Sequence, residues 1–200
     1  MMIKKSFAPG RFFCPLPLYI IGTNNENGTP NFATVTWMAS NWNGKPHIMV
    51  GLGAARQARH NVMRDGVFSL SLVSKDLVWL ADHLGSAIGH DIYPDVEYAI
   101  GFGDEIQVPT IEDSPMVFEC RVSRTFDMDG DAKAFIGDIE NIQLAADVQD
   151  MHPREGLDLL ALDPVLFAPD RYYGIGEDLG PCDGWSDHIE ELRKLDPRHP

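Results

Sequence analysis

The order of apolar and polar residues between Tyr19 and Leu72 predicts several strands interrupted by a single helix. Short runs rich in β-branched and aromatic residues, bounded by Gly, Asn and Pro, are typical of strands. Small residues followed by a longer mixed segment are typical of a helix start. We therefore expect strands at residues 19–23, 32–39, 47–52 and 67–72, and a helix that begins within residues 55–61.

The first two strands are predicted to form a hairpin. Asn27-Gly28 stands between them and is the strongest short hairpin signal. Residues 32–39 alternate, which places Thr34 and Thr36 on one face. Short hydroxyl side chains on a strand can hydrogen-bond a phosphate or the polar edge of a ring, or they can simply face water. The strand alone leaves both interpretations open.

The start of the predicted helix has the features of an anion site. Gly53-Ala54-Ala55 lets the backbone approach a ligand closely, and Arg56 and Arg59 follow. A helix N-terminus offers unpaired N–H groups to an anion. The two arginines could instead form surface ion pairs. In a chain with a formal net charge of −14, cations concentrated at one place favour a bound anion.

The second half of the chain continues with short strands. Residues 76–84 have apolar positions at helical spacing, so we expect a helix packed on the sheet. An alternating segment at residues 117–125 predicts a strand, and a strand at 134–144 would pair back with it after an acidic turn at residues 127–131. This turn resembles a calcium loop, but the glutamate expected at its far end is missing, and a hairpin is the better interpretation. We also expect strand and turn at residues 165–168 and 172–174, and a short helix at residues 186–195. Many short strands with few helices indicate a barrel.

Several segments, taken in order and spacing, resemble the flavin reductase-like family, nearest to its flavoredoxin branch. They are NFATVTW at residues 31–37, ARQARHN at 55–61, GVFSLSL at 66–72, LGSAIGHD at 84–91, SPMVFEC at 114–120, FIGDI at 135–139 and YYGIG at 172–176. The resemblance covers residues 8–180. It implies a mainly β chain folded as an FMN-binding split β-barrel with helical insertions, usually a homodimer with the flavin at the subunit boundary. We expect this domain at residues 1–180 and a C-terminal helical tail at residues 181–200.

The resemblance also implies a cofactor, FMN held without a covalent bond, and residues that would bind it. The ring and ribityl chain would meet Asn31, Ala33, Thr34, Val35 and Thr36, and the phosphate would meet Ala55, Arg56, Gln57 and Arg59. Asn61 belongs to the same candidate set, and Ser86 and His90 are secondary candidates, because their loop borders the flavin in the family. The family often has an Asp-His pair where this chain has Asp131-Ala132. No proton-transfer role is carried over from that position, and no catalytic residue is named.

The composition of the chain excludes some classes of binding partner. The net charge of −14 and a pI of about 4.7 argue against nucleic acid and anionic membranes, since both bind cationic surfaces. The three cysteines are widely spaced and form no CxxC motif, so neither a disulfide framework nor a zinc or other metal site is expected, which suits the cytoplasm. Prolines interrupt the apolar run after Lys4 and Lys5, and no stretch is long enough to span a bilayer.

The resemblance favours an NAD(P)H-dependent flavin reductase, with NAD(P)H as a transient co-substrate. The chain has no GxGxxG motif, so a nicotinamide would bind without a Rossmann domain. Two alternatives stay open. The chain could be a flavoredoxin-type electron carrier that passes electrons to a redox partner protein without a substrate of its own. It could also be a non-enzymatic split-barrel protein that binds another small molecule.

Overall fold

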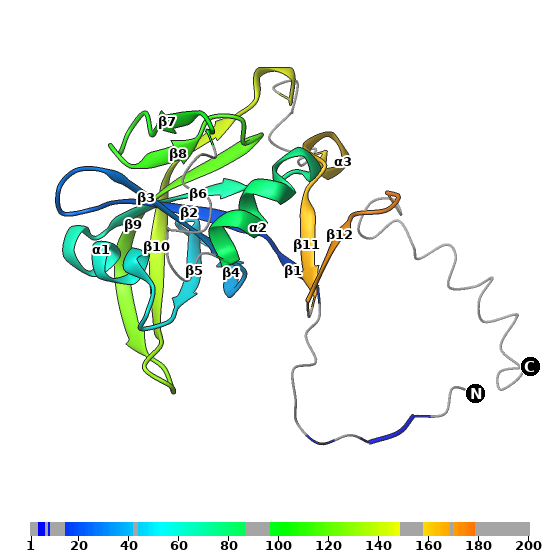
Figure 1. The fold of residues 1–200 in the computed structure, drawn as a ribbon, viewed down its shortest axis with the longest axis horizontal. Coiled ribbons are helices and arrows are strands. Elements are labelled where there is room, and N and C mark those ends of the chain that lie inside the picture. The colour runs from blue at the N-terminus through cyan, green and yellow to red at the C-terminus, as the bar shows by residue number, and fades with distance from the viewer. Residues whose placement is uncertain are drawn as a thin grey trace, which may run out of the picture.

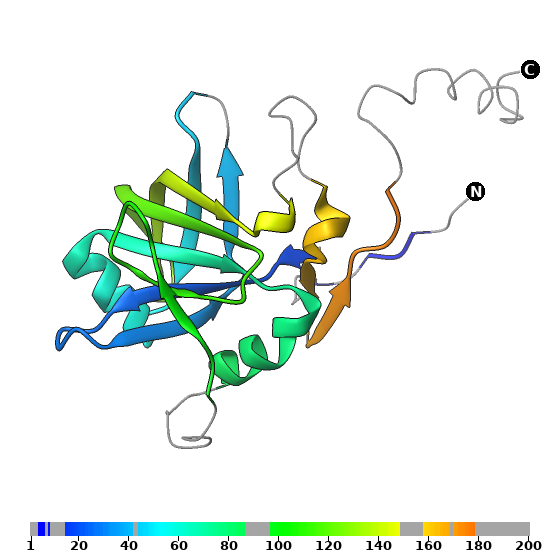
Figure 2. The ribbon, with the colours of Figure 1, turned by 90° about the horizontal axis from the view of Figure 1, so that it is seen from above.

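A curled antiparallel sheet of seven strands, in the order β3-β2-β6-β9-β10-β5-β4, forms the centre of the fold (Figures 1 and 2). The computed structural model describes residues 4–6, 8, 15–41, 44–86, 97–148, 158–168 and 170–178. The strands are β2 (Tyr19–Asn24), β3 (Pro30–Val35), β4 (Met38–Asn41), β5 (His47–Leu52), β6 (Val67–Leu72), β9 (Met116–Asp127) and β10 (Lys133–Leu144). The two edge strands, β3 and β4, follow each other in the chain. This arrangement confirms the predicted split barrel.

Two hydrophobic clusters hold the sheet and its helices together. The first fills the barrel interior and includes Val50, Phe68 and Phe135, together with Ala58 and Val62 of helix α1 (Gln57–Asp65). Helix α1 therefore closes one end of the barrel. The second cluster lies outside β2 and β3, where the 3-10 turn η1 (Lys75–Leu77) and helix α2 (Val78–Ser86) pack. The helix predicted at residues 76–84 is thus confirmed, with an apolar side against the sheet.

The short strand β8 (Pro109–Ile111) packs against β2 and β6, and β7 (Ile100–Phe102) pairs with β8. The loop between them is fastened by the fully buried carboxylate of Glu119 on β9. That carboxylate accepts hydrogen bonds from the backbone N–H groups of residues 104, 105 and 106 at 2.7–2.9 Å, and from Asn141 Nδ2 at 2.8 Å. Burial alone would raise the pKa of Glu119, but the hydrogen bonds outweigh it and lower the pKa below its usual value.

A second, small sheet stands beside α2 and comprises β1 (Leu16–Pro17), β11 (Val165–Ala168) and β12 (Arg171–Gly174). The turn η2 (Ala146–Val148) and helix α3 (Leu159–Leu162) lie between β10 and β11 in the chain. The strand predicted at residues 165–168 is confirmed by β11. The turn predicted at residues 172–174 is wrong, because these residues belong to strand β12, which pairs with β11. The predicted tail at residues 181–200 and its helix lie outside the described residues. Among the residues described, no helix has the length and apolar character needed to cross a bilayer.

Both predicted hairpins are confirmed. Gly28 has a φ of +82° in the turn between β2 and β3, and Gly130 has a φ of +70° between β9 and β10. The continuous strand predicted at residues 32–39 is wrong. It breaks at Thr36 and Trp37, because the chain crosses there from one edge of the sheet to the other. Thr34 and Thr36 therefore do not share one uninterrupted strand face.

Candidate functional site

The loop between β5 and α1 presents a helix start that no side chain caps. Arg56 occupies the N-cap position in an extended conformation, with φ −85° and ψ 124° and no side-chain cap bond. Its backbone N–H donates to the carbonyl of Gly53 at 3.1 Å. The first N–H groups of a helix need partners from outside the helix. Combined with their partial positive charge, this makes the loop suited to binding an anion.

Cationic side chains gather beside this loop. Within the described residues, Arg59 Nε is the only buried side-chain nitrogen or oxygen without a hydrogen-bond partner. Lys133, which pairs with Leu52 at the end of β5, forms an ion pair with Asp127. The hydrogen bond from Lys133, its charge and the charge of Arg59 lower the pKa of the Asp127 carboxyl. Lys133 was missed by sequence reasoning, because only the register of β10 brings it beside β5.

Most of the candidate residues on or just after β3 use their side chains in the fold, and only Thr36 does not. Ala33 and Val35 are buried in the barrel interior, and Asn31 is buried and accepts a hydrogen bond from the Thr23 hydroxyl at 3.3 Å. Their side chains are used in the fold. Thr34 donates from its hydroxyl to the carbonyl of Ala81 in α2 at 3.0 Å. By contrast, Thr36 lies past the end of β3, half-buried, in the crossing to β4.

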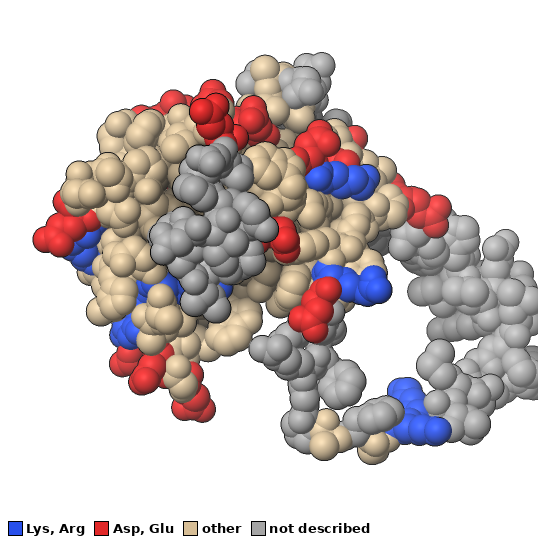
Figure 3. Space-filling model, in the orientation of Figure 1, with Lys and Arg blue, Asp and Glu red and all other residues tan. Residues whose placement is uncertain are grey.

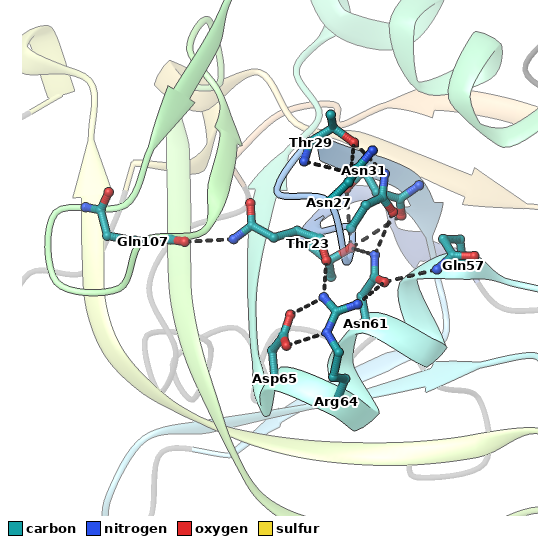
Figure 4. Close-up of polar contacts among 11 residues, drawn as sticks. Thr23, Asn27, Thr29, Asn31, Gln57, Asn61, Arg64, Asp65 and Gln107 are labelled. Carbon is teal, nitrogen blue, oxygen red and sulfur yellow. Dashed lines mark hydrogen bonds and ion pairs between the residues drawn. The ribbon is translucent and has the colours of Figure 1, made fainter.

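Asn61 lies fully buried between α1 and the β2–β3 hairpin (Figure 4). Its amide nitrogen donates to Thr23 Oγ1 at 3.0 Å and to Asn25 Oδ1 at 3.1 Å. Its amide oxygen accepts from Gln57 Nε2 at 3.0 Å. These contacts fix the position of α1 and the side chain of Gln57. The structure thus places Asn61 where it supports the helix from behind, rather than at the open loop with Ala55 and Arg56.

Trp37 is a residue that sequence reasoning treated only as part of a strand face. Its side chain is 52% exposed, directly after Thr36. It lies over Gly51, where a Cβ atom would come within 3.2 Å of Trp37 Cβ. The Gly51 N–H also donates to the Trp37 carbonyl at 2.8 Å. The facing glycine therefore makes room for an aromatic ring beside the loop that begins α1.

The remaining candidate residues are Ser86 and His90, and the structure also has an apolar cavity beside Tyr19. Ser86 ends α2, but its side chain, like all of His90, lies outside the described residues. Burial raises the pKa of Tyr19 to about 12. Tyr19 also lines an apolar cavity of about 520 Å³. The other residues that line it are Pro17, Met38, Ala39, Ser40, Ile48, Met116, Phe118, Ile142 and Leu144. A cavity of this size is within the range that holds small ligands.

A comparison of the sequence with models of known protein families identifies the family of this chain. A family model described as "Flavin reductase like domain" matches residues 10–176. The chain belongs to this family. Curated proteins gave no match to the sequence.

Solved structures share the split-barrel fold of this flavin reductase-like chain. Flavoredoxin of Desulfovibrio vulgaris (Miyazaki F) is 25% identical, with a TM-score of 0.79 over 91% of this chain and 98% of its own. An FMN-binding protein from Thermus thermophilus, with bound p-hydroxybenzaldehyde, is 19% identical, with a TM-score of 0.71 over 90% and 100%. The styrene monooxygenase flavin reductase from Pseudomonas putida S12 is 20% identical, with a TM-score of 0.65 over 82% and 94%. Family membership supports a flavin cofactor for this chain.

Proposed function

We propose that this flavin reductase-like chain binds FMN without a covalent bond and catalyses its reduction by NAD(P)H in the cytoplasm. The observation that carries the proposal is the uncapped start of α1 with Arg56 and Arg59 beside it, in a chain with a net charge of −14. Figure 3 shows acidic side chains around much of one face, with basic side chains next to several of them. A local group of cations on such a protein favours a specific anionic ligand.

The residues at this loop fit a flavin phosphate. The backbone N–H groups at the start of α1, the side chain of Arg56 and the unpaired Arg59 Nε are donors that a phosphate would satisfy. Ala55 and Gln57 flank them, and Asn61 holds Gln57 from behind. Lys133 adds a third cation nearby. The phosphate end of the cofactor is therefore assigned to this loop.

The ring and ribityl chain are assigned to the crossing between β3 and β4. Thr36 offers a hydroxyl there, and Trp37 offers an exposed aromatic surface. Asn31, Ala33, Thr34 and Val35 would contribute through the backbone of β3, and Ser86 and His90 remain secondary candidates. When bound, the flavin supplies the hydride-accepting chemistry, whereas the protein binds and orients it.

The first experiment is a visible absorption spectrum of purified, dialysed protein, followed by titration with FMN and, separately, riboflavin. We expect a flavin spectrum or fluorescence quenching, and tighter binding of FMN than of riboflavin because of the phosphate. A colourless protein that binds neither flavin would overturn the proposal and favour a split-barrel protein for another ligand. Equal affinities for FMN and riboflavin would support a flavin site but contradict the binding of the phosphate by the α1 loop.

A flavoredoxin-type electron carrier is the second candidate function. It is favoured by the 25% identity to a flavoredoxin over nearly the full length of both chains. Oxidation of NADH and of NADPH with free FMN separates the two functions, since a reductase turns over and a carrier does not. Purified protein with tightly bound FMN, no turnover and rapid reduction by a redox partner protein would support the carrier.

A further inference from the structure

The apolar cavity that Tyr19 lines is bounded by side chains of the core. Four of its lining residues belong to the first hydrophobic cluster and are only 3–8% exposed, namely Tyr19, Ile48, Met116 and Phe118. Another lining residue, Ile142, is 41% exposed. The cavity of about 520 Å³ therefore reaches from solvent to the core, and a molecule inside it would be largely removed from water.

The lining of the cavity suits an uncharged aromatic molecule. The rings of Tyr19 and Phe118 stack there, with their centroids 6.1 Å apart. Met38 and Met116 also line the cavity, and methionine sulfur atoms make favourable contacts with aromatic rings. None of the described residues that line the cavity is charged. Because an unpaired charge is costly to move into apolar surroundings, these walls favour a neutral compound.

Tyr19 brings to the cavity a polar group that the fold does not use. Its side chain is buried, yet its hydroxyl makes no hydrogen bond within the part of the chain that the structure describes. Burial alone raises the pKa of Tyr19 to about 12, so the hydroxyl stays protonated at neutral pH and can donate. The hydroxyl of a buried tyrosine usually has a hydrogen-bond partner. An acceptor atom on a ligand in the cavity would be such a partner.

The cavity is distinct from the residues assigned to the flavin. Ile48 lines it on β5, whereas the α1 loop begins after Leu52, about 13 Å further along the strand at 3.3 Å per residue. Trp37 lies over Gly51, and side chains three residues apart on a strand point to opposite faces. The Trp37 ring and the Ile48 side chain therefore lie on opposite faces of β5.

We propose that this cavity is a second ligand site, which binds a small, uncharged aromatic compound that carries a hydrogen-bond acceptor such as a carbonyl oxygen. The aromatic part of the ligand packs against the rings of Tyr19 and Phe118 and the two methionines. The Tyr19 hydroxyl donates to the acceptor. This site goes beyond the proposed reduction of FMN and does not depend on it, because none of the residues that line the cavity is assigned to the flavin.

Fluorescence titration of the full chain with Prodan, an uncharged naphthalene that carries one ketone oxygen, tests the proposal. We expect saturable binding of Prodan, with its emission shifted to shorter wavelength by the apolar surroundings. Tyr19→Phe removes only the donor and should weaken Prodan binding by about 2–10-fold, the loss of one neutral hydrogen bond. Tyr173→Phe is the matched control, since Tyr173 is an exposed tyrosine that does not line the cavity. An unchanged affinity in Tyr19→Phe would overturn the hydrogen bond from Tyr19.

A blocking variant tests the location of the site. Ser40 is exposed and lines the cavity, so the larger side chain in Ser40→Trp should fill the space and abolish saturable Prodan binding. Thr125→Trp places the same ring at an exposed position of β9 outside the cavity and should bind Prodan like the wild type. Circular dichroism verifies that each variant is folded. A wild type that does not bind Prodan, or a Ser40→Trp variant that binds it normally, would overturn the site.

A competition experiment tests whether the cavity and the flavin site are separate. We expect the dissociation constant of Prodan to stay the same when FMN is added in excess. Displacement of Prodan by FMN would overturn the second site. The two proposals can fail independently, because the Prodan titrations need no flavin and the FMN titrations need no Prodan.

Discussion

A Cβ atom on Gly85 would lie 2.4 Å from the hydroxyl oxygen of Thr34, so the C-terminal part of α2 rests directly on β3. The same hydroxyl donates to the Ala81 carbonyl at 3.0 Å. Thr34 is therefore engaged in joining helix to sheet. The side chain that remains for a ligand is that of Thr36, beyond the end of β3.

This close approach predicts that Gly85→Ala destabilises the protein by about 1–3 kcal/mol, by overpacking. The sign of this change in stability is informative, because alanine ordinarily stabilises a helix relative to glycine by about 1 kcal/mol. In a Thr34→Ala background the clash disappears, and Gly85→Ala should become neutral or stabilising. Urea unfolding of the four proteins in this double-mutant cycle gives the coupling energy. Additive effects would show that the two residues do not meet.

Local signals in the sequence were sufficient for the two hairpin turns and for most strands. Asn27-Gly28 and Gly130 mark hairpins through backbone conformations that glycine adopts easily, and both were predicted. The crossing at Thr36 and Trp37 was missed, because alternation continues through it while the chain changes from one sheet edge to the other. Which strands share an edge is a property of the whole sheet.

Long-range contacts explain what was missed in the candidate site. Glu119 alternates with Phe118 and Cys120 like an ordinary outward residue, yet it is fully buried under a loop from residues 103–107. Lys133 reaches the α1 loop only through the register of β10 with β5. Neither contact leaves a periodic signal along the chain. The α1 loop itself was predicted, since its small residues and arginines are adjacent in sequence.

Arg56→Ala should weaken FMN binding by about 1.5–3 kcal/mol if its guanidinium makes a charge-assisted bond to the phosphate. Riboflavin affinity should not change, because riboflavin has no phosphate. Paired titrations of both flavins measure the difference. Arg171→Ala on β12 is the control, as an exposed arginine in the small sheet. An unchanged FMN affinity for Arg56→Ala would remove Arg56 from the site.

Asn61→Ala should act mainly on stability. Removing the amide leaves Thr23 and Asn25 without a buried donor and releases Gln57, which we expect to destabilise the fold by about 1–3 kcal/mol. Thermal unfolding followed by circular dichroism measures the loss, and Arg56→Ala should show no comparable loss. A fully stable Asn61→Ala protein that has lost its preference for FMN over riboflavin would instead make Asn61 a direct phosphate ligand.

Glu119 should make the stability of the protein depend on acid pH. Although burial alone raises its pKa, the hydrogen bonds from Asn141 and three backbone N–H groups lower the pKa in the folded state. A lowered pKa in the folded state means that the stabilisation is present above the pKa of the unfolded chain and is lost as pH falls through the folded value.

Glu119→Gln should therefore destabilise the protein at neutral pH by about 1–3 kcal/mol, because an amide nitrogen would face backbone donors. Its unfolding free energy should also fall less steeply than that of the wild type as the pH is lowered below about 4.3, the ordinary pKa of a glutamate. Urea unfolding across acid pH measures both effects, and Glu112→Gln, at an exposed glutamate, is the control. Parallel pH profiles for Glu119→Gln and the wild type would show that the loop at residues 103–107 is not held by the charged carboxylate.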